Sequence, residues 1–457
     1  MNRVTKRSWL MGVFVLLLLG GMTFFVLEYA VKADKWVVSP GSPHVFQGSN
    51  LGTGTVVDRD NVILLDVADN RSYSDNAETR ASTLHWLGDR QGSIRAGALG
   101  SYAALMSGYD KVNGLYDFSG SGGVAMLTLS ARVQNAALRA LNGRKGTVGV
   151  YNYKTGELLC AVTSPTYDPD NVPDIAGDTT GTYEGVYLNR FLQSSYVPGS
   201  IFKVVTTAAA LECVPDIESR TFTCYGAYEY GTEAVTCETT HGTLDLKGAL
   251  ARSCNCCFAQ IAELVGRKNM EKYVKKFCVT DSLSFDGVTT VKGNYDISNT
   301  GGASFAWSCI GQHSDLINPA RFMTFMGIIA NGGKGVEPYL VKSVTRDEEV
   351  LYEAEENETD RIMKKETAEK LALFLRNNVQ TIYGDGHFPG LSVCAKSGTS
   401  QLGGGQKSNA MFAGFLRDEA YPLAFIVVVE NGGYGSAACV PVLSQVLKEC
   451  KAVLDGA

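Results

Sequence analysis

The sequence predicts an α+β protein in which helices flank a central antiparallel sheet, behind one apolar N-terminal segment. Short β-prone runs gather at residues 147–163 and again at 392–430, and the chain between them has helical spacing. No segment repeats with a period of about 20 to 50 residues, which excludes a solenoid. We therefore expect residues 123–457 to form one α+β domain.

Composition narrows the class of protein further. The 457 residues are 45% hydrophobic and 19% charged, as in an ordinary globular protein. The net charge is −6, and no stretch concentrates Lys and Arg as a nucleic-acid groove would, so DNA and RNA are excluded as partners. Twelve cysteines, all between Cys160 and Cys450, are too sparse for a disulfide scaffold. The core must come from packing.

The N-terminal segment is long enough to cross a bilayer. Ser8 to Leu27 carries no charge, and at about 1.5 Å per residue it spans roughly the 30 Å hydrocarbon core. Arg3, Lys6 and Arg7 precede it, so we expect the N-terminus in the cytoplasm and the rest of the chain outside. The alternative is a cleaved signal peptide, whose apolar region is usually about 7–15 residues long, and no clear cleavage site follows here.

A small β-rich module follows the anchor. Residues 54–65 are rich in β-branched side chains, whereas 66–80 are polar and prone to turns. A Gly- and Ser-rich stretch at 116–123 marks the boundary to the next domain. The expected organisation is a cytoplasmic tail at 1–7, a transmembrane helix at 8–31, a membrane-proximal module at 32–122 and a catalytic-sized domain at 123–457.

The large domain begins with an expected helix over 125–141, with Arg132 and Gln134 on its polar side. A hairpin follows, in which residues 153–156 form the turn. The remaining predicted elements are strands at 147–152, 157–163, 392–400, 410–416 and 423–430, and an amphipathic helix at 437–454.

Ser200 and Lys203 form the first catalytic candidate. Pro198 and Gly199 make a turn, after which Ser200 opens an apolar, Ala-rich helix. A serine at a helix N-terminus lies near unpaired backbone N–H groups, which suits a nucleophile and its oxyanion. Lys203 lies one turn later on the same face, and burial would lower its pKa enough to let it take the serine proton.

Two further motifs follow in order. Ser253 and Asn255 are two residues apart in a predicted tight turn, so that a hydroxyl and a carboxamide can point into one cleft. Lys396, Ser397, Gly398 and Thr399 lie on a predicted strand, where Gly398 lets a substrate backbone approach the sheet edge and Lys396 supplies positive charge.

Two literal matches to the same motifs occur earlier in the chain. Ser74-Asp75-Asn76 lies in the polar part of the membrane-proximal module, and Lys154-Thr155-Gly156 is the turn of the first hairpin. Both precede Ser200, which is the wrong order for a shared site. We expect both to be surface turns.

The three motifs in this order are the signature of penicillin-binding proteins and serine β-lactamases, and the chain resembles a class B penicillin-binding protein. Its similar segments are Asp58-Arg59, Leu127–Gln134, Gly149–Glu157, Asn189-Arg190, Cys309–Gln312 and Ala330–Gly333. The resemblance implies a penicillin-binding transpeptidase fold and a peptidoglycan D,D-transpeptidase in the bacterial cell membrane. It also implies inhibition by β-lactams. The small module between the anchor and the large domain leaves no room for the glycosyltransferase domain that bifunctional relatives carry there.

The resemblance also implies roles for the residues. Ser200 would attack the stem peptide and Lys203 would take its proton, with the N–H groups of Ser200 and Thr399 as the oxyanion hole. Ser253 would relay the proton to the leaving amine, and Asn255 would hold the donor amide. The substrate carboxylate would bind Lys396, Ser397 and Thr399.

The resemblance implies no cofactor, and it implies a membrane partner, a SEDS-type glycan polymerase. A D,D-carboxypeptidase, a β-lactamase and a β-lactam-sensing receptor remain alternatives. The motifs do not distinguish a septal from a side-wall role.

The cysteines raise two questions. Cys254, Cys256 and Cys257 surround Asn255, but their spacing fits no closed four-ligand zinc site and a fourth ligand is missing, so we expect no metal. Cys224 and Cys237 bracket a polar loop outside the membrane, and the sequence leaves open whether they form a disulfide.

Overall fold

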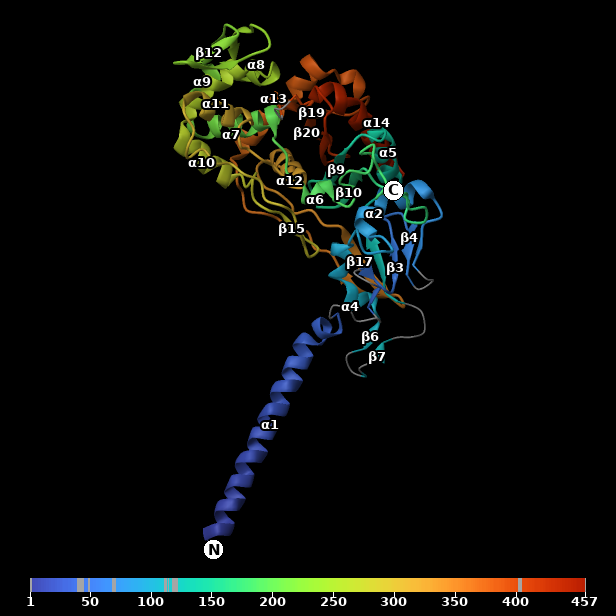
Figure 1. The fold of residues 1–457 in the computed structure, drawn as a ribbon. Coiled ribbons are helices and arrows are strands. Elements are labelled where there is room, and N and C mark those ends of the chain that lie inside the picture. The colour runs from blue at the N-terminus through green and yellow to red at the C-terminus, as the bar shows by residue number, and fades with distance from the viewer. Residues whose placement is uncertain are drawn as a thin grey trace.

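One long helix leads into the body of the protein (Figure 1). The computed structural model describes residues 2–38, 45–47, 50–67, 71–110, 113, 115–116, 122–401 and 405–456. Helix α1 (Asn2–Val37) contains the predicted apolar segment and projects away from the rest of the chain (Figure 1). Among the described helices it is the one long and apolar enough to cross a membrane, over Arg3–Ala33, and that window is not buried against the protein.

A six-stranded sheet lies in the end of the body from which α1 projects, and it combines distant parts of the chain (Figure 1). Its order is β18-β17-β8-β3-β4-β5, with β3 parallel to β8 and every other pair antiparallel. The strands are β3 (Thr55–Val57), β4 (Ile63–Asp66), β5 (Ser72–Tyr73), β8 (Val124–Leu127), β17 (Val341–Arg346) and β18 (Glu349–Glu353). The sheet thus joins strands from before and after the expected boundary near residue 122. Residues 117–121 of that boundary lie outside the described residues.

The helix expected over 125–141 is wrong in its first part. Residues 124–127 are strand β8, and helix α5 is Ala131–Leu141. Gln134 is fully buried rather than on a polar face, because its amide donates to the Ser82 carbonyl and its Oε1 accepts from the Ala161 N–H. Burying a side-chain amide costs little free energy when its N–H donor and its oxygen acceptor are both hydrogen-bonded. A polar residue at this position therefore does not mark the exposed side of the helix.

The central sheet has five antiparallel strands in the order β10-β9-β21-β20-β19. They are β9 (Gly146–Asn152), β10 (Leu158–Ser164), β19 (Val393–Ser400), β20 (Asn409–Leu416) and β21 (Leu423–Val429). The five strands predicted from the sequence are confirmed. Strand β21 reads Leu-Ala-Phe-Ile-Val-Val-Val and is buried throughout, as expected for a strand covered on both faces.

Successive residues of the central sheet face two separate cores. Phe412 belongs to the core under α5 and α14 (Gly435–Asp455), whereas Met411 and Ala413 belong to the larger core on the other face. That second face packs against α12 (Pro319–Ala330) and α13 (Lys365–Asn378). The two layers of helices hold the sheet rigidly, with β19 at its edge.

A helical lobe lies beside strand β19 (Figure 1). Its helices are α7 (Lys203–Cys213), α8 (Leu246–Ala251), α9 (Asn255–Val265), α10 (Arg267–Lys276) and α11 (Gly302–Ile310). Its hairpin strands are β11 (Thr221–Cys224), β12 (Ala227–Tyr230), β13 (Glu233–Thr236) and β14 (Gly242–Asp245). The remaining strands and α-helices of the described residues are β1 (Phe46–Gln47), β2 (Asn50–Leu51), β6 (Tyr109–Asp110), β7 (Leu115–Tyr116), β15 (Ser284–Phe285), β16 (Val288–Thr289), α2 (Ala77–Leu87), α3 (Gly97–Gly100), α4 (Ala103–Met106) and α6 (Arg190–Gln193). Within the same part of the chain, four short 3-10 or π turns are η1 (Gly199–Phe202), η2 (Ile217–Ser219), η3 (Val379–Tyr383) and η4 (Asp385–His387).

Candidate active site

Ser200 lies on a turn that is pressed against the edge strand β19. It belongs to a short 3-10 turn, η1 (Gly199–Phe202), which runs directly into α7. Gly199 has φ +55°, and a Cβ there would lie 2.6 Å from the Thr399 carbonyl oxygen. Only glycine fits this position. The predicted Pro198-Gly199 turn therefore also sets how closely Ser200 approaches the strand.

Lys203 is fully buried, and its side-chain nitrogen lies within hydrogen-bond distance of the serine hydroxyl. Its Nζ lies 3.1 Å from Ser200 Oγ, and it donates to the Ser253 carbonyl at 2.6 Å and to Asn255 Oδ1 at 2.7 Å. A neutral amine has two N–H donors and one lone pair. The two carbonyl acceptors, which are its nearest neighbours, occupy the donors, so the lone pair is left for a hydroxyl. Ser200 Oγ at 3.1 Å and Ser253 Oγ at 3.2 Å are the two hydroxyl oxygens within reach.

Electrostatics favour the neutral form of Lys203. Burial, and then the positive charge of Lys396, lower the pKa of Lys203 to about 7. A lysine that is substantially neutral near pH 7 can accept a proton from a serine hydroxyl.

Ser253 and Asn255 reach the site from the start of α9. Ser253 has φ +54°, Cys254 is the N-cap, and Asn255 is the first residue of the helix. Asn255 donates from Nδ2 to the Thr236 carbonyl at 2.8 Å while its Oδ1 faces Lys203. The carboxamide is thus held at both ends, and the turn predicted from the sequence is a left-handed residue followed by a helix cap.

Lys396 also approaches the Ser253 hydroxyl, which lies between it and Lys203. Its Nζ lies 3.0 Å from Ser253 Oγ and donates to the Ser397 carbonyl at 2.9 Å, and Tyr383 Oη lies 3.5 Å away. Burial lowers the pKa of Lys396 to about 7. The three oxygen neighbours can accept all three N–H bonds of an ammonium group. The charge of Lys396 lowers the pKa of Lys203 further, whereas burial is the cause for Lys396 itself, so we assign the proton to Lys396.

Gly398 and Thr399 complete the strand. A Cβ at Gly398 would lie 2.7 Å from the Pro198 carbonyl oxygen, so glycine is needed for β19 to pack against the serine turn. Thr399 Oγ1 accepts from the Gly435 N–H at 3.0 Å, and the Thr399 carbonyl accepts from Gln312 Nε2 at 3.3 Å. All eight predicted site residues therefore lie in one region.

Sequence reasoning missed Tyr383, which has no motif around it. The Ser397 N–H donates to Tyr383 Oη at 3.0 Å, and the Ser397 and Tyr383 hydroxyls are 3.0 Å apart. Tyr383 ends a π-helical turn after α13 and is buried. It lines the pocket and holds the backbone of the lysine-bearing strand there.

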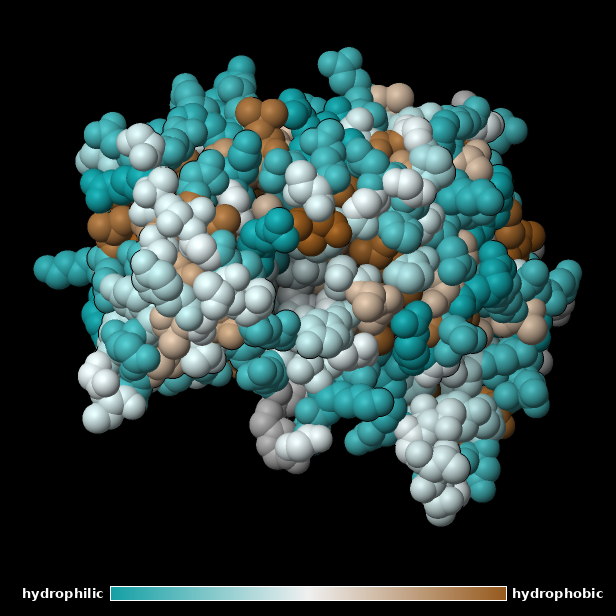
Figure 2. Space-filling model, turned by 90° about the horizontal axis from the view of Figure 1, so that it is seen from above, coloured by the Kyte–Doolittle hydropathy of each residue, from teal (hydrophilic) through white to brown (hydrophobic). Residues whose placement is uncertain are grey.

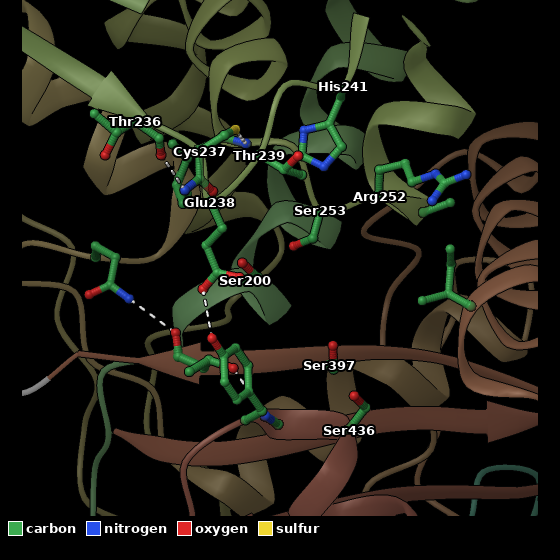
Figure 3. A pocket seen from close by; sticks show the side chains of 18 of the residues that line it. Ser200, Thr236, Cys237, Glu238, Thr239, His241, Arg252, Ser253, Ser397 and Ser436 are labelled. Atoms are coloured by element: carbon green, nitrogen blue, oxygen red, sulfur yellow. Dashed lines mark hydrogen bonds between the residues drawn. The ribbon is translucent and has the colours of Figure 1, made fainter. Parts of the chain in front are cut away.

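The motifs open into a pocket of about 580 Å³. Figure 3 shows Ser200, Ser253 and Ser397 around this space, with Thr236, Cys237 and His241 on one wall. Glu238 and Tyr434 meet across it, with Tyr434 Oη donating to Glu238 Oε1 at 3.4 Å. The face in Figure 2 is mostly hydrophilic and is hollowed near its centre. A polar, open pocket of this size suits an extended peptide.

The two earlier motif matches lie elsewhere. Asn76 caps helix α2, accepting from the Glu78 and Thr79 N–H groups. Lys154 lies in the turn of the β9–β10 hairpin, where its backbone N–H donates to Asn152 Oδ1. Neither lines the pocket. Both are turn or cap residues, as expected.

Residues 146–448 match the penicillin binding protein transpeptidase domain. The peptidoglycan D,D-transpeptidase PbpA of Mycobacterium tuberculosis is 27% identical over 363 residues, 72% of this chain and 72% of that protein. The ceftriaxone acyl-enzyme complex of M. tuberculosis penicillin-binding protein A has a TM-score of 0.76 at 23% identity, over 87% of this chain and 98% of that one. A chain from a peptidoglycan synthase complex, described as coordinating polymerization and crosslinking, has a TM-score of 0.62 at 22% identity, over 72% of this chain and 63% of that one.

Proposed function

The chain belongs to the penicillin-binding protein transpeptidase family, and we propose that its three motifs form the site that cross-links peptidoglycan stem peptides through an acyl-enzyme on Ser200. Within that family it is a class B protein, a serine-type D,D-transpeptidase of the kind that β-lactams acylate. The observation that carries the site assignment is the environment of Lys203. Its two donors are taken by carbonyl oxygens, and its nitrogen lies 3.1 Å from Ser200 Oγ.

Acylation begins with proton transfer from Ser200 Oγ to neutral Lys203. The alkoxide attacks the carbonyl carbon of the penultimate D-Ala, and the new oxyanion accepts hydrogen bonds from the backbone N–H groups of Ser200 and Thr399. The C–N bond to the terminal D-Ala then breaks. Ser253 passes the proton to that leaving amine, because its hydroxyl lies within 3.2 Å of Lys203 Nζ.

The substrate is held from both sides of the pocket. Lys396 keeps a positive charge beside Ser253, and the Ser397 and Thr399 hydroxyls lie on the same strand, so together they bind the terminal carboxylate of the stem peptide or the ring carboxylate of a penicillin. Asn255 holds the donor amide. An amine of a second stem peptide then attacks the ester carbonyl and forms the cross-link. The acyl C–O bond to Ser200 breaks, and the proton that the amine loses returns to Ser200 Oγ.

The apolar helix α1 anchors the chain, and we place the N-terminus in the cytoplasm because Arg3, Lys6 and Arg7 precede the apolar segment. The catalytic site then lies outside, in the bacterial cell envelope where peptidoglycan is made. A glycan polymerase in the same membrane is the proposed partner. The likeness to a chain of a peptidoglycan synthase complex supports that partner.

The test is covalent labelling of the full chain in detergent with a fluorescent penicillin, followed by intact mass over hours. We expect one long-lived adduct that Ser200→Ala abolishes and Ser74→Ala leaves intact. Labelling that survives Ser200→Ala would refute the nucleophile. Rapid loss of label with hydrolysed penicillin would instead identify a β-lactamase, and product analysis with a stem pentapeptide and an amine acceptor distinguishes a transpeptidase from a carboxypeptidase.

A further inference from the structure

Four side chains that can bind a metal ion meet on the wall of the pocket. They are Cys224, Cys237, His241 and Cys254, and their potential ligand atoms all lie within 4.8 Å of one another. Cys224 ends strand β11, Cys237 follows β13, His241 precedes β14, and Cys254 caps helix α9. The four side chains thus come from three segments that the fold brings to one point, because Cys237 and His241 share the loop between β13 and β14.

The distances suit tetrahedral coordination. Cys237 Sγ and Cys254 Sγ are 3.6 Å apart, and Cys224 Sγ lies 3.7 Å from His241 Nδ1. With Zn–S near 2.3 Å and Zn–N near 2.0–2.1 Å, a tetrahedral site places its sulfur atoms about 3.8 Å apart and its sulfur and nitrogen about 3.6 Å apart. The three cysteines are free thiols, including Cys224 and Cys237, so the disulfide that the sequence left open does not form here.

Backbone donors point at two of these sulfur atoms. Cys237 Sγ accepts from the N–H groups of Asn255 at 3.1 Å and Cys256 at 3.4 Å, and Cys254 Sγ accepts from the Cys257 N–H at 3.5 Å. The N-terminus of α9 is therefore directed at the cluster. Such donors stabilise negative charge on sulfur, as they do around metal-bound thiolates.

The neighbouring cysteines are placed differently. Cys256 donates its thiol to the Val235 carbonyl and Cys257 donates to the Phe222 carbonyl, which pairs both as protonated thiols. The sequence-based expectation of no metal considered Cys254 together with these two residues and found no fourth ligand. The structure groups Cys254 instead with partners 13, 17 and 30 positions earlier in the chain.

We propose that Cys224, Cys237, His241 and Cys254 bind one Zn²⁺ ion. Three thiolates and one imidazole in a closed tetrahedral set are typical of structural zinc, and soft sulfur ligands disfavour Mg²⁺ and Ca²⁺. Cys224 and Cys254 are fully buried, so the ion would sit beneath the pocket wall with only the Cys237 and His241 side partly exposed.

The ion would also position the catalytic turn, a role that rests on the proposed function. Cys254 lies between Ser253 and Asn255, and Cys237 follows Thr236, whose carbonyl accepts from Asn255 Nδ2. Zinc would therefore tie both neighbours of the Asn255 carboxamide to one point. Asn255 Oδ1 and the Ser253 carbonyl in turn hold Lys203, so the four ligands act as positioning residues for the base.

Metal content tests the site without reference to activity. We expect about one zinc per full-length chain purified in detergent without chelator, and a thiolate-to-metal charge-transfer band when Co²⁺ replaces it. His241→Ala and Cys224→Ala should lose the ion, whereas Cys213→Ala, a half-exposed cysteine outside the cluster, should retain it. His241→Cys should restore zinc as a four-thiolate site even if His241→Ala folds poorly. Parent protein that takes up neither metal, or ligand variants that keep full zinc, would overturn the proposal.

Acylation by the fluorescent penicillin tests the positioning role. Removing zinc should lower the limiting acylation rate about 10–100-fold with little change in the half-saturating concentration, and adding Zn²⁺ should restore it. An unchanged limiting rate in zinc-free protein would refute positioning while leaving the metal site standing. If zinc-loaded parent protein is not acylated at all, the proposed function fails, and the metal content still reports on the site.

Discussion

The Nζ atom of Lys396 lies 3.0 Å from the Oγ atom of Ser253. Lys203 Nζ reaches the same oxygen from the other side at 3.2 Å, so one hydroxyl bridges two buried lysines. A hydroxyl has one proton to donate and can accept from two groups. The bridge therefore lets a proton taken from Ser200 by Lys203 continue toward a leaving group without crossing bulk water.

Acylation should depend on pH through Lys203. Its pKa is lowered to about 7, and only the neutral amine accepts the Ser200 proton, so the rate should rise as the pH increases through 7. Between pH 6 and 8 we expect an increase of about tenfold in the acylation rate constant. Stopped-flow labelling with a β-lactam stable over this range measures it. A flat or falling profile would contradict the assignment of the base.

Removing the bridging Ser253 hydroxyl should slow acylation, although the nucleophile Ser200 and its base Lys203 remain. We expect Ser253→Ala to lower the limiting acylation rate by about 10²-fold, the lower end of the range for proton-transfer groups. Ser74→Ala, in the unrelated Ser-Asp-Asn match, serves as the matched control and should keep the parent rate. Equal rates for the parent and Ser253→Ala would exclude a relay through this hydroxyl.

A methyl group at Gly398 should push the serine turn away from β19. The Cβ of Gly398→Ala would lie 2.7 Å from the Pro198 carbonyl oxygen and 3.1 Å from the Ile201 side chain. Overpacking of this kind costs about 1–3 kcal/mol and displaces backbone. We expect a lower thermal midpoint and acylation slowed more than about tenfold. Gly386→Ala, where nothing lies within 4 Å of the new Cβ, is the control for a glycine change.

Tyr383→Phe should weaken substrate binding by loosening the strand at the pocket wall. It removes the oxygen that accepts from the Ser397 N–H, and a buried donor left without its partner costs about 1–3 kcal/mol. Because Ser397 is proposed to bind the carboxylate, the half-saturating β-lactam concentration should rise. Saturation kinetics of labelling check this, and a change confined to the limiting rate would argue against a role in positioning Ser397.

Asp315 should make stability depend on pH. Its carboxylate oxygens are buried without a hydrogen-bond partner among the described residues, and burial raises its pKa well above 3.8. A pKa raised in the folded state means that folding is favoured most at low pH and loses this contribution as the pH rises and the group must ionise. We expect Asp315→Asn to raise the thermal midpoint relative to the parent more at pH 8 than at pH 5. The same difference at both values would contradict a protonated carboxyl.

Several local features follow from the sequence because they depend on neighbours in the chain. The i, i+3 spacing of Ser200 and Lys203, the turn before them and the apolar runs of β19, β20 and β21 are set by periodicity and turn chemistry. The order of the three motifs also lies in the sequence. The helical pattern predicted Gln134 on the polar side of its helix, and this was wrong because its burial depends on hydrogen-bond partners at Ser82 and Ala161.

Tertiary structure alone decided which distant residues meet. Tyr383 reaches Ser397, and Cys224, Cys237 and His241 join Cys254, although no periodicity or motif connects them. The sequences of β3, β8 and β17 likewise do not indicate that these strands join in one sheet. The physical reason is that hydrogen bonds and ligand geometry act over a few ångströms in space, whereas the path that brings these residues together is fixed by packing of the whole chain.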